Sequence, residues 1–277
     1  MNSFTSVAFI TLFLFFYGFL NRFALAQQPN PATTKGRPIP DSLLQTPADS
    51  LIRQRFVLFD SLNYRFLGDG NFSRGNINRT LIVTRAEITV NGPVVSLSTN
   101  PRFAFGKQNR ILAERDTYVD LFLDIYKEKR LYGFGLATLE KSNLRGINLR
   151  QLAGVGLGLR LLKTANHNLS LTNAVIYEST DFRSRPTLTT QRNSTRLKGK
   201  HAFLQNKIRF NHITFVQPAL SDFSNLRWNT ILSLELPLNK WVSIRTGFEN
   251  SYESVVEANR KNNDTRLTFG IAVGNRP

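Results

Sequence analysis

The feature that most constrains the fold is an alternation of apolar with small or polar residues, two residues per period. Period-two alternation predicts a strand with one apolar face. The pattern recurs about a dozen times, and turn residues separate the repeats. Such repetition predicts a closed antiparallel barrel whose apolar side faces lipid. In the clearest case, residues 264–274, Leu267, Phe269, Ile271 and Val273 alternate with Arg266, Thr268, Gly270, Ala272 and Gly274.

We predict an all-β chain whose barrel, residues 62–277, contains twelve antiparallel strands. The alternation is weakest in the eighth strand and in the second. The predicted strands span residues 62–74, 77–90, 93–106, 115–126, 130–140, 149–162, 168–178, 196–209, 212–220, 226–237, 241–252 and 264–274.

The strand faces that carry charge are predicted to line the lumen. An arginine against lipid costs about 2–4 kcal/mol near the membrane midplane, so these faces must look inward. The inward charges are mixed in sign, and two hypotheses remain open: a wet channel, or an interior closed by its own salt bridges. The residues predicted to face the lumen are Asp120, Asp124, Arg160, Glu235, Arg245, Glu249 and Arg266.

The predicted connections alternate in length. The even-numbered ones are tight, including Asn91-Gly92, Phe210-Asn211 and Leu238–Lys240. Most odd-numbered ones are longer, including Lys107–Glu114, Asp181–Thr195 and Glu253–Asn263. Short turns at one rim and long loops at the other are typical of bacterial outer-membrane barrels with both termini in the periplasm. A soluble β-sandwich does not require this pattern.

The first 26 residues are predicted to direct secretion. Residues 1–26 have the apolar run and the Ala24-Leu25-Ala26 cleavage site of a signal peptide, with cleavage after Ala26. The run is shorter than the roughly 20 residues of a membrane-spanning helix. Residues 27–61 are predicted to be a periplasmic proline-rich linker and a short segment, for which a helix and an added strand both remain open.

Composition limits the partners. The chain has no cysteine, which excludes a disulfide-stapled domain and any cysteine-ligated metal or nucleophile. Its formal charge of +17 suits nucleic acid, but Lys and Arg are spread along the chain rather than gathered on one helix or stripe. We therefore predict no nucleic-acid partner and expect contact with outer-membrane lipids and lipopolysaccharide.

One predicted loop is strongly basic. The connection Asp181–Thr195, together with the start of the next strand, is predicted to lie outside the cell. There, arginine could pair with lipopolysaccharide phosphates in bidentate fashion. A solvated loop without a ligand is the alternative. The candidate contacts are Arg183, Arg185, Arg192, Arg196, Lys198 and Lys200.

The three histidines give an alternative function. Nucleophilic catalysis needs a base within hydrogen-bond reach of a hydroxyl, and no Ser lies two residues from His201 on its own strand. A partner on a neighbouring strand remains open, so His201 is the candidate base of a lipid-modifying enzyme. His167 and His212 are predicted to lie near turns. No two histidines are close in sequence, and we predict no metal site and no cofactor.

Several segments resemble a known family. The stretch 145–158, with Arg145-Gly146-Ile147-Asn148 running into Gly154-Val155-Gly156, is similar to a segment of the salt-induced outer-membrane proteins. Residues 217–223, 238–241 and 263–270 fit the same pattern in the same order. These YdiY-like barrels are grouped as a domain of unknown function. The resemblance implies an outer-membrane barrel with no established activity and no functional residues to transfer.

The sequence thus predicts a barrel in the outer membrane of a Gram-negative bacterium, with a structural, envelope-stress or narrow passive-pore role and no catalysis. Periplasmic chaperones and the barrel assembly machinery are expected partners during biogenesis. That machinery commonly reads a final aromatic residue, whereas here the last strand offers Phe269 and the chain ends at Pro277. A soluble secreted β protein that binds acidic ligands is a third hypothesis, supported by the charge alone. The sequence does not indicate an oligomeric state.

Overall fold

A computed structural model describes residues 59–74, 78–258 and 260–275. The predicted signal peptide, the linker and most of the segment 51–61 lie outside these residues. Within them, no helix is long and apolar enough to cross a membrane. The strands are β1 (Ser61–Ser73), β2 (Arg79–Asn91), β3 (Val95–Thr99), β4 (Arg102–Gln108), β5 (Ile111–Ile125), β6 (Leu131–Ser142), β7 (Ile147–Lys163), β8 (His167–Phe182), β9 (Leu188–Phe203), β10 (Ile208–Pro218), β11 (Leu226–Pro237), β12 (Val242–Glu253) and β13 (Asn263–Asn275).

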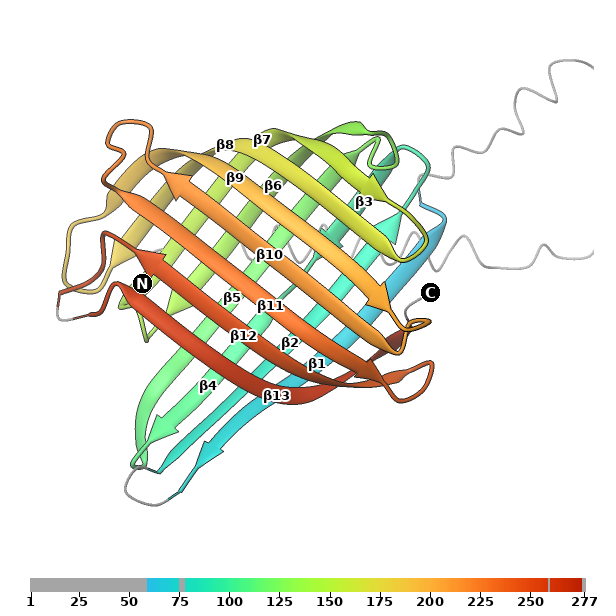
Figure 1. Cartoon of the computed structure of the whole chain (residues 1–277). Helices are drawn as coiled ribbons and strands as arrows, with labels where there is room; N and C mark the ends of the chain where they lie inside the picture. The colour runs from blue at the N-terminus through green and yellow to red at the C-terminus, as the bar shows by residue number, and fades with distance from the viewer. Residues whose placement is uncertain (1–58, 75–77, 259, 276–277) are drawn as a thin grey trace, which may run out of the picture. The chain divides into compact units, whose positions relative to one another are not determined.

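The strands close into one antiparallel barrel (Figure 1). The sheet is closed by β1 and β13, where residues 64–70 pair with residues 269–275. β3 and β4 lie end to end between β2 and β5, and together form a single interrupted strand of the wall. The wall therefore has twelve strands, and the predicted fold is confirmed.

The interruption between β3 and β4 falls at Asn100 and Pro101. Proline has no N–H to contribute to a strand ladder. Asp120 of β5 satisfies the chain at this point, because its carboxylate accepts hydrogen bonds from the backbone N–H of Asn100 at 2.6 Å and from its side-chain amide at 3.1 Å. The predicted strand 93–106 consequently forms as two shorter strands.

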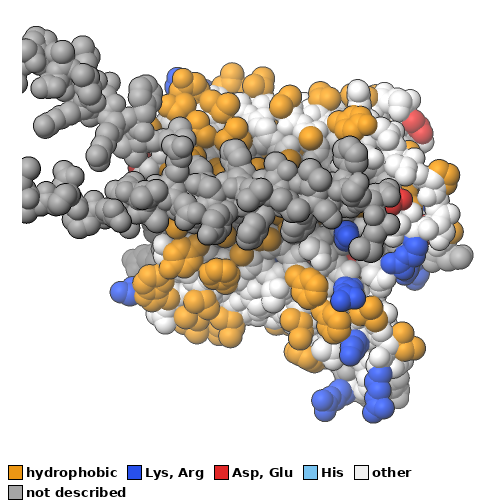
Figure 2. All heavy atoms as spheres, turned by 180° about the vertical axis from the view of Figure 1, so that it is seen from behind, with side chains coloured by type: hydrophobic (Ala, Val, Ile, Leu, Met, Phe, Trp, Pro, Cys, Tyr) orange, Lys and Arg blue, Asp and Glu red, His pale blue; other side chains and the backbone are white. Residues whose placement is uncertain are grey.

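The outer wall is apolar, as the alternation predicted. Phe269 and Ile271 of β13 are 59% and 52% exposed, and Val155 of β7 is 72% exposed. Figure 2 shows hydrophobic side chains spread over one side of this wall. The buried side chains include many that are charged, such as Arg65, Glu235 and Arg245. A closed sheet that is apolar outside and charged inside is suited to span a lipid bilayer.

Substitution of Val155 by arginine tests which face meets lipid. Val155 lies at the middle of β7, so we expect Val155→Arg to lower the free energy of unfolding from lipid vesicles by about 2–4 kcal/mol. Leu131→Arg, at the end of β6, is the matched control and should cost about 0–1 kcal/mol. Urea unfolding measures both. Equal costs at the two positions would contradict a bilayer centred on Val155.

The predicted boundaries of two strands are wrong. β9 spans Leu188–Phe203 rather than 196–209, β10 spans Ile208–Pro218 rather than 212–220, and the turn between them is 204–207 rather than Phe210-Asn211. The outward residues of the first half of β9 are polar, among them Gln191, Asn193 and Thr195. Apolar alternation therefore could not reveal where this strand begins.

The contrast in loop length is also smaller than predicted. The third connection is only the turn Asn109-Arg110, with φ of 50° and 69°, and the seventh is residues 183–187. The longest described connections, 219–225 and 254–262, do lie at the odd-numbered rim. At that rim the hairpins β1–β2 and β4–β5 project beyond the other strands (Figure 1).

Candidate functional site: the charged lumen

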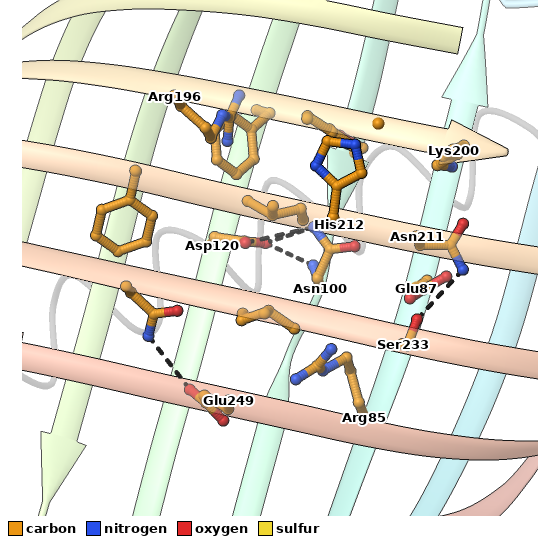
Figure 3. A pocket seen from close by; sticks show the side chains of 18 of the residues that line it. Arg85, Glu87, Asn100, Asp120, Arg196, Lys200, Asn211, His212, Ser233 and Glu249 are labelled. Carbon is orange, nitrogen blue, oxygen red and sulfur yellow. Dashed lines mark hydrogen bonds between the residues drawn. The ribbon is translucent and has the colours of Figure 1, made fainter. Parts of the chain in front are cut away.

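The barrel encloses a cavity of about 1060 Å³ whose wall carries fifteen Lys and Arg side chains and ten Asp and Glu side chains. Strand alternation directs charge into this space, because lipid excludes it from the other face. All seven residues predicted to face the lumen lie at the wall of the cavity. Figure 3 shows Arg196 and Lys200 of β9, and Arg85 and Asp120 from other parts of the wall, around this common space.

A group of ion pairs crosses the lumen near the odd-numbered rim. Arg150 of β7 donates to Glu253 of β12 at 2.6 and 2.8 Å, although these strands are not neighbours in the sheet. Arg145 contacts Glu140 and Glu253. We call this group the cross-lumen network: Glu140, Arg145, Arg150, Glu178, Arg192, Arg227 and Glu253.

Glu178 is the centre of the cross-lumen network. It is 1% exposed and pairs with Arg192 at 2.6 Å, with Arg227 at 3.1 Å and with Arg150 at 3.3 Å. These arginines come from β7, β9 and β11. A carboxylate out of contact with water is tolerated only when several donors satisfy it, as here. The network therefore joins six strands of the barrel, β6, β7, β8, β9, β11 and β12, and narrows the lumen at this level.

Two further groups of ion pairs bridge strands that are not neighbours. Nη1 of Arg102 in β4 donates to both carboxylate oxygens of Glu249 in β12, at 2.9 and 3.0 Å. Arg266 pairs with the same carboxylate and with Glu114 of β5. Elsewhere, Arg65 of β1 pairs with Glu235 of β11, and Arg245 of β12 pairs with Asp69 of β1. Much of the mixed charge is thus neutralised within the lumen.

The loops at the odd-numbered rim pack on one another beside the cross-lumen network. The carboxylate of Glu257 accepts a hydrogen bond from the backbone N–H of Ser184 at 3.0 Å, which holds the pKa of Glu257 below its ordinary value. Arg185 donates to the carbonyl of Val256. Gly146, with φ of +68°, lies against Glu257, where an added Cβ would lie 2.8 Å from the Glu257 Cβ. These contacts fix the loops 143–146, 183–187 and 254–262 as a unit.

The basic loop predicted to contact lipopolysaccharide does not exist in that form. Only Arg183 and Arg185 lie in the connection, and both are exposed. Arg192 is buried in the cross-lumen network, and Arg196, Lys198 and Lys200 line the cavity from β9. The prediction failed because β9 begins eight residues earlier than its apolar pattern suggested.

Arg196, Lys198 and Lys200 form a row that we call the basic track. Successive inward positions of a strand are about 7 Å apart, so three cations follow the lumen wall. The guanidinium of Arg196 lies 4.8 Å from the ring centre of Phe122 on β5, across the barrel. No carboxylate lies within ion-pair distance of Arg196 or Lys198 among the described residues, unlike the arginines of the three paired groups.

The remaining predicted lumen residues lie toward the even-numbered rim. Asp124 pairs with Lys127 at 3.1 Å, and Arg160 donates to the carbonyl of Glu128 at 2.8 Å. Lys163 also binds Glu128, and its hydrogen bond lowers the pKa of that carboxyl. The carboxylate of Asp120 accepts hydrogen bonds from Asn100 at the interruption between β3 and β4. These charged groups are therefore largely held in ion pairs or hydrogen bonds, whereas Arg196 and Lys198 have no carboxylate within ion-pair distance among the described residues.

Several residues that build the lumen were missed. Arg102, Glu114, Arg150, Glu178 and Arg227 are inward on their strands and carry the ion pairs. Each of these residues alternates with outward-facing residues along its strand. Its position in the alternation could therefore have identified it as inward-facing. Their pairing could not be found in this way, because it depends on how strands far apart in the chain meet.

The three histidines lie together, contrary to the expectation that no close pair exists. His167 and His201 approach through their Nδ1 atoms at 3.3 Å, and His201 and His212 through their Nε2 atoms at 3.3 Å. His167 begins β8, and His212 lies in β10 close to the turn 204–207. Among the described residues, no hydrogen bond joins a histidine ring to a Ser or Thr hydroxyl.

Comparison with known proteins gives a family. The model of the family described as "Protein of unknown function, DUF481" matches residues 70–274. No curated protein matches the chain.

Three solved structures are similar in architecture. A NanC porin structure is 13% identical with a TM-score of 0.49, covering 78% of this chain and 100% of that chain. The translocator domain of autotransporter NalP from Neisseria meningitidis is 12% identical with a TM-score of 0.44, covering 83% and 92%. A KdgM porin in complex with disordered oligogalacturonate is 13% identical with a TM-score of 0.41, covering 76% and 97%.

Proposed function

The chain belongs to the protein family of unknown function DUF481, and we propose that it forms a narrow, passive pore that prefers anions and has no catalytic activity. The observation that carries this proposal is the wall of the lumen, with fifteen basic and ten acidic side chains. A cavity lined by one sign of charge concentrates ions of the other sign. Arg196 and Lys198 of the basic track have no carboxylate within ion-pair distance among the described residues.

The architecture supports passage of small solutes rather than large ones. A twelve-stranded barrel lies between the eight-stranded barrels that side chains fill and the sixteen-stranded porins that leave an aqueous channel. The cross-lumen network and the reach of Arg196 to Phe122 both narrow the space that remains. Solutes would therefore pass in single file between charged groups, and hydrated inorganic anions or small organic acids fit best.

We place this pore in the outer membrane of a Gram-negative bacterium, exported with a signal peptide cleaved after Ala26. The apolar wall and the shorter even-numbered connections support this orientation, with the termini in the periplasm. Chaperones and the barrel assembly machinery would act during biogenesis. For lipopolysaccharide, the projecting hairpins are better placed than the predicted loop, because exposed Arg79, Lys107, Arg110 and Arg115 gather there (Figure 2).

A lipid-modifying enzyme is less well supported. Such an enzyme needs a hydroxyl within hydrogen-bond reach of its base. The ring of His201 instead lies between two other histidine rings, at 3.3 Å from each. The described part of the chain offers no Ser or Thr in that position, so His201 is not proposed as a catalytic base.

Recordings from planar bilayers test the proposal. We expect the full mature chain, refolded and inserted, to give discrete conductance steps with a reversal potential on the anion side in a KCl gradient. A gradient around 0.1 M is suitable, because the screening length there is about 10 Å and the wall charges are felt across the lumen. Silence from protein shown to be inserted, or a preference for cations, would overturn the proposal.

A further inference from the structure

The three histidines of the chain border the cavity at the even-numbered rim, and their rings meet on the outer face of the barrel. His167 of β8 pairs with His201 of β9, and His212 of β10 pairs with Gly199. Side chains alternate between the faces of a strand. Since the neighbouring Lys200 and Asn211 project inward, the three imidazoles project outward, at the even-numbered rim.

The rings are held in a defined geometry. The rings of His201 and His212 are within 7° of parallel and face each other through Nε2 atoms 3.3 Å apart. His167 approaches His201 on its other side, with the two Nδ1 atoms 3.3 Å apart. Phe203 and Phe210 lie beside the His201 ring, with centroids 6.3 Å away in each case. Figure 3 shows the ring of His212 reaching from β10 toward β9.

We propose that His201 and His212 form a binding site for a divalent transition-metal cation such as Cu²⁺, Ni²⁺ or Zn²⁺. Imidazole nitrogen binds these ions at about 2.0–2.1 Å. An ion at that distance from both Nε2 atoms would subtend an angle of about 107°, close to tetrahedral. No described group of three or more His, Cys, Asp and Glu is arranged to hold a metal ion, so water fills the other positions.

His167 orients the site without binding the ion. A histidine that binds metal usually donates its other ring N–H to an acceptor, which fixes its tautomer and orientation. With Nε2 of His201 on the metal, its Nδ1–H points at Nδ1 of His167. His167 is then protonated on Nε2 and accepts this hydrogen bond. Each of the three histidines therefore has a distinct role.

Gly199 makes the approach of His212 possible. It lies opposite His212 in the ladder, and a Cβ added there would lie 2.7 Å from Cδ2 of the His212 ring. Only glycine lets the ring lie flat across β9 and reach His201. The alanine variant should move a flexible side chain rather than the backbone, and thus weaken the site without removing a ligand.

Calorimetric titration of the full chain with Cu²⁺ alone, without an affinity tag and in detergent at pH 7.5, tests the proposal. We expect one Cu²⁺ per chain and no binding of Mg²⁺. His201→Gln and His212→Gln should each abolish Cu²⁺ binding. His167→Gln should weaken binding about tenfold or more. Gly199→Ala should weaken binding although all three histidines are present. Thr214→Ala, on the same outer face, is the control and should bind as the unaltered chain does. Binding should weaken as the pH is lowered, because protons compete with the cation for the imidazole nitrogens.

The chain makes this test decisive, because it has no cysteine and no other histidine. Absence of saturable binding, or binding that survives His201→Gln, would overturn the site. Unchanged affinity in His167→Gln would overturn the orienting role alone. Nitrogen hyperfine structure in the electron paramagnetic resonance spectrum of bound Cu²⁺ should count two imidazoles, and heat-modifiable migration should show that each variant is folded. These results do not depend on whether the lumen conducts.

Discussion

Removal of the pair Arg150 and Glu253 should raise the single-channel conductance severalfold. These side chains meet across the lumen at 2.6 and 2.8 Å and belong to strands that are not neighbours. The double variant Arg150→Ala with Glu253→Ala shortens both without changing the net charge of the wall. The gain would therefore come from the wider aperture rather than from altered electrostatics.

The double variant is preferable to either single one. Removal of one member takes away one partner of the other buried charge, and complete loss of pairing costs about 3–5 kcal/mol, whereas removal of both members avoids this penalty. Glu178 retains Arg192 and Arg227 in every case. The matched control is Glu128→Ala with Lys163→Ala, an exposed pair at the other rim, which should leave conductance unchanged. If the folded double variant conducts like the unaltered chain, the cross-lumen network is not the constriction.

The barrel itself could be predicted from the sequence because lipid imposes a strict alternation. Wherever the outer face is apolar, as in residues 264–274, the alternation shows where the strand lies and which of its residues face the lumen. β9 shows where this reasoning fails, since Gln191, Asn193 and Thr195 on its outer face conceal the start of the strand. Arg192 and the basic track were then assigned to a loop, although they face the interior.

The contacts that define the lumen depend on information that alternation does not carry. Arg150 and Glu253 are 103 residues apart, and Arg266 and Glu114 are 152 apart. Whether such residues meet depends on the stagger at which the sheet closes, and that stagger is set by the β1–β13 pairing and every turn between. The histidines show the same limit: spacing suggested isolation, whereas the register of β8, β9 and β10 brings them together.

Reversal of the charge of the basic track should reverse the ion preference of the pore. Arg196→Glu, Lys198→Glu and Lys200→Glu together would change the wall from fifteen basic and ten acidic side chains to twelve and thirteen. The glutamine triple variant should reduce the anion preference without reversing it. Both effects should fade in 1 M salt, where the screening length falls to about 3 Å. Reversal potentials measured at low and high salt provide the test.

A control of equal charge separates the wall from the protein as a whole. Lys107→Glu, Arg110→Glu and Arg115→Glu change the net charge of the chain by the same amount, but these residues are exposed at the projecting hairpins and do not line the cavity. We expect this variant to keep its anion preference, since charges beyond a screening length contribute little. An equal shift in both variants would mean that the field of the whole surface sets selectivity. A shift confined to the β9 variant would place selectivity in the lumen, because only there do the substituted charges lie beside the permeating ion.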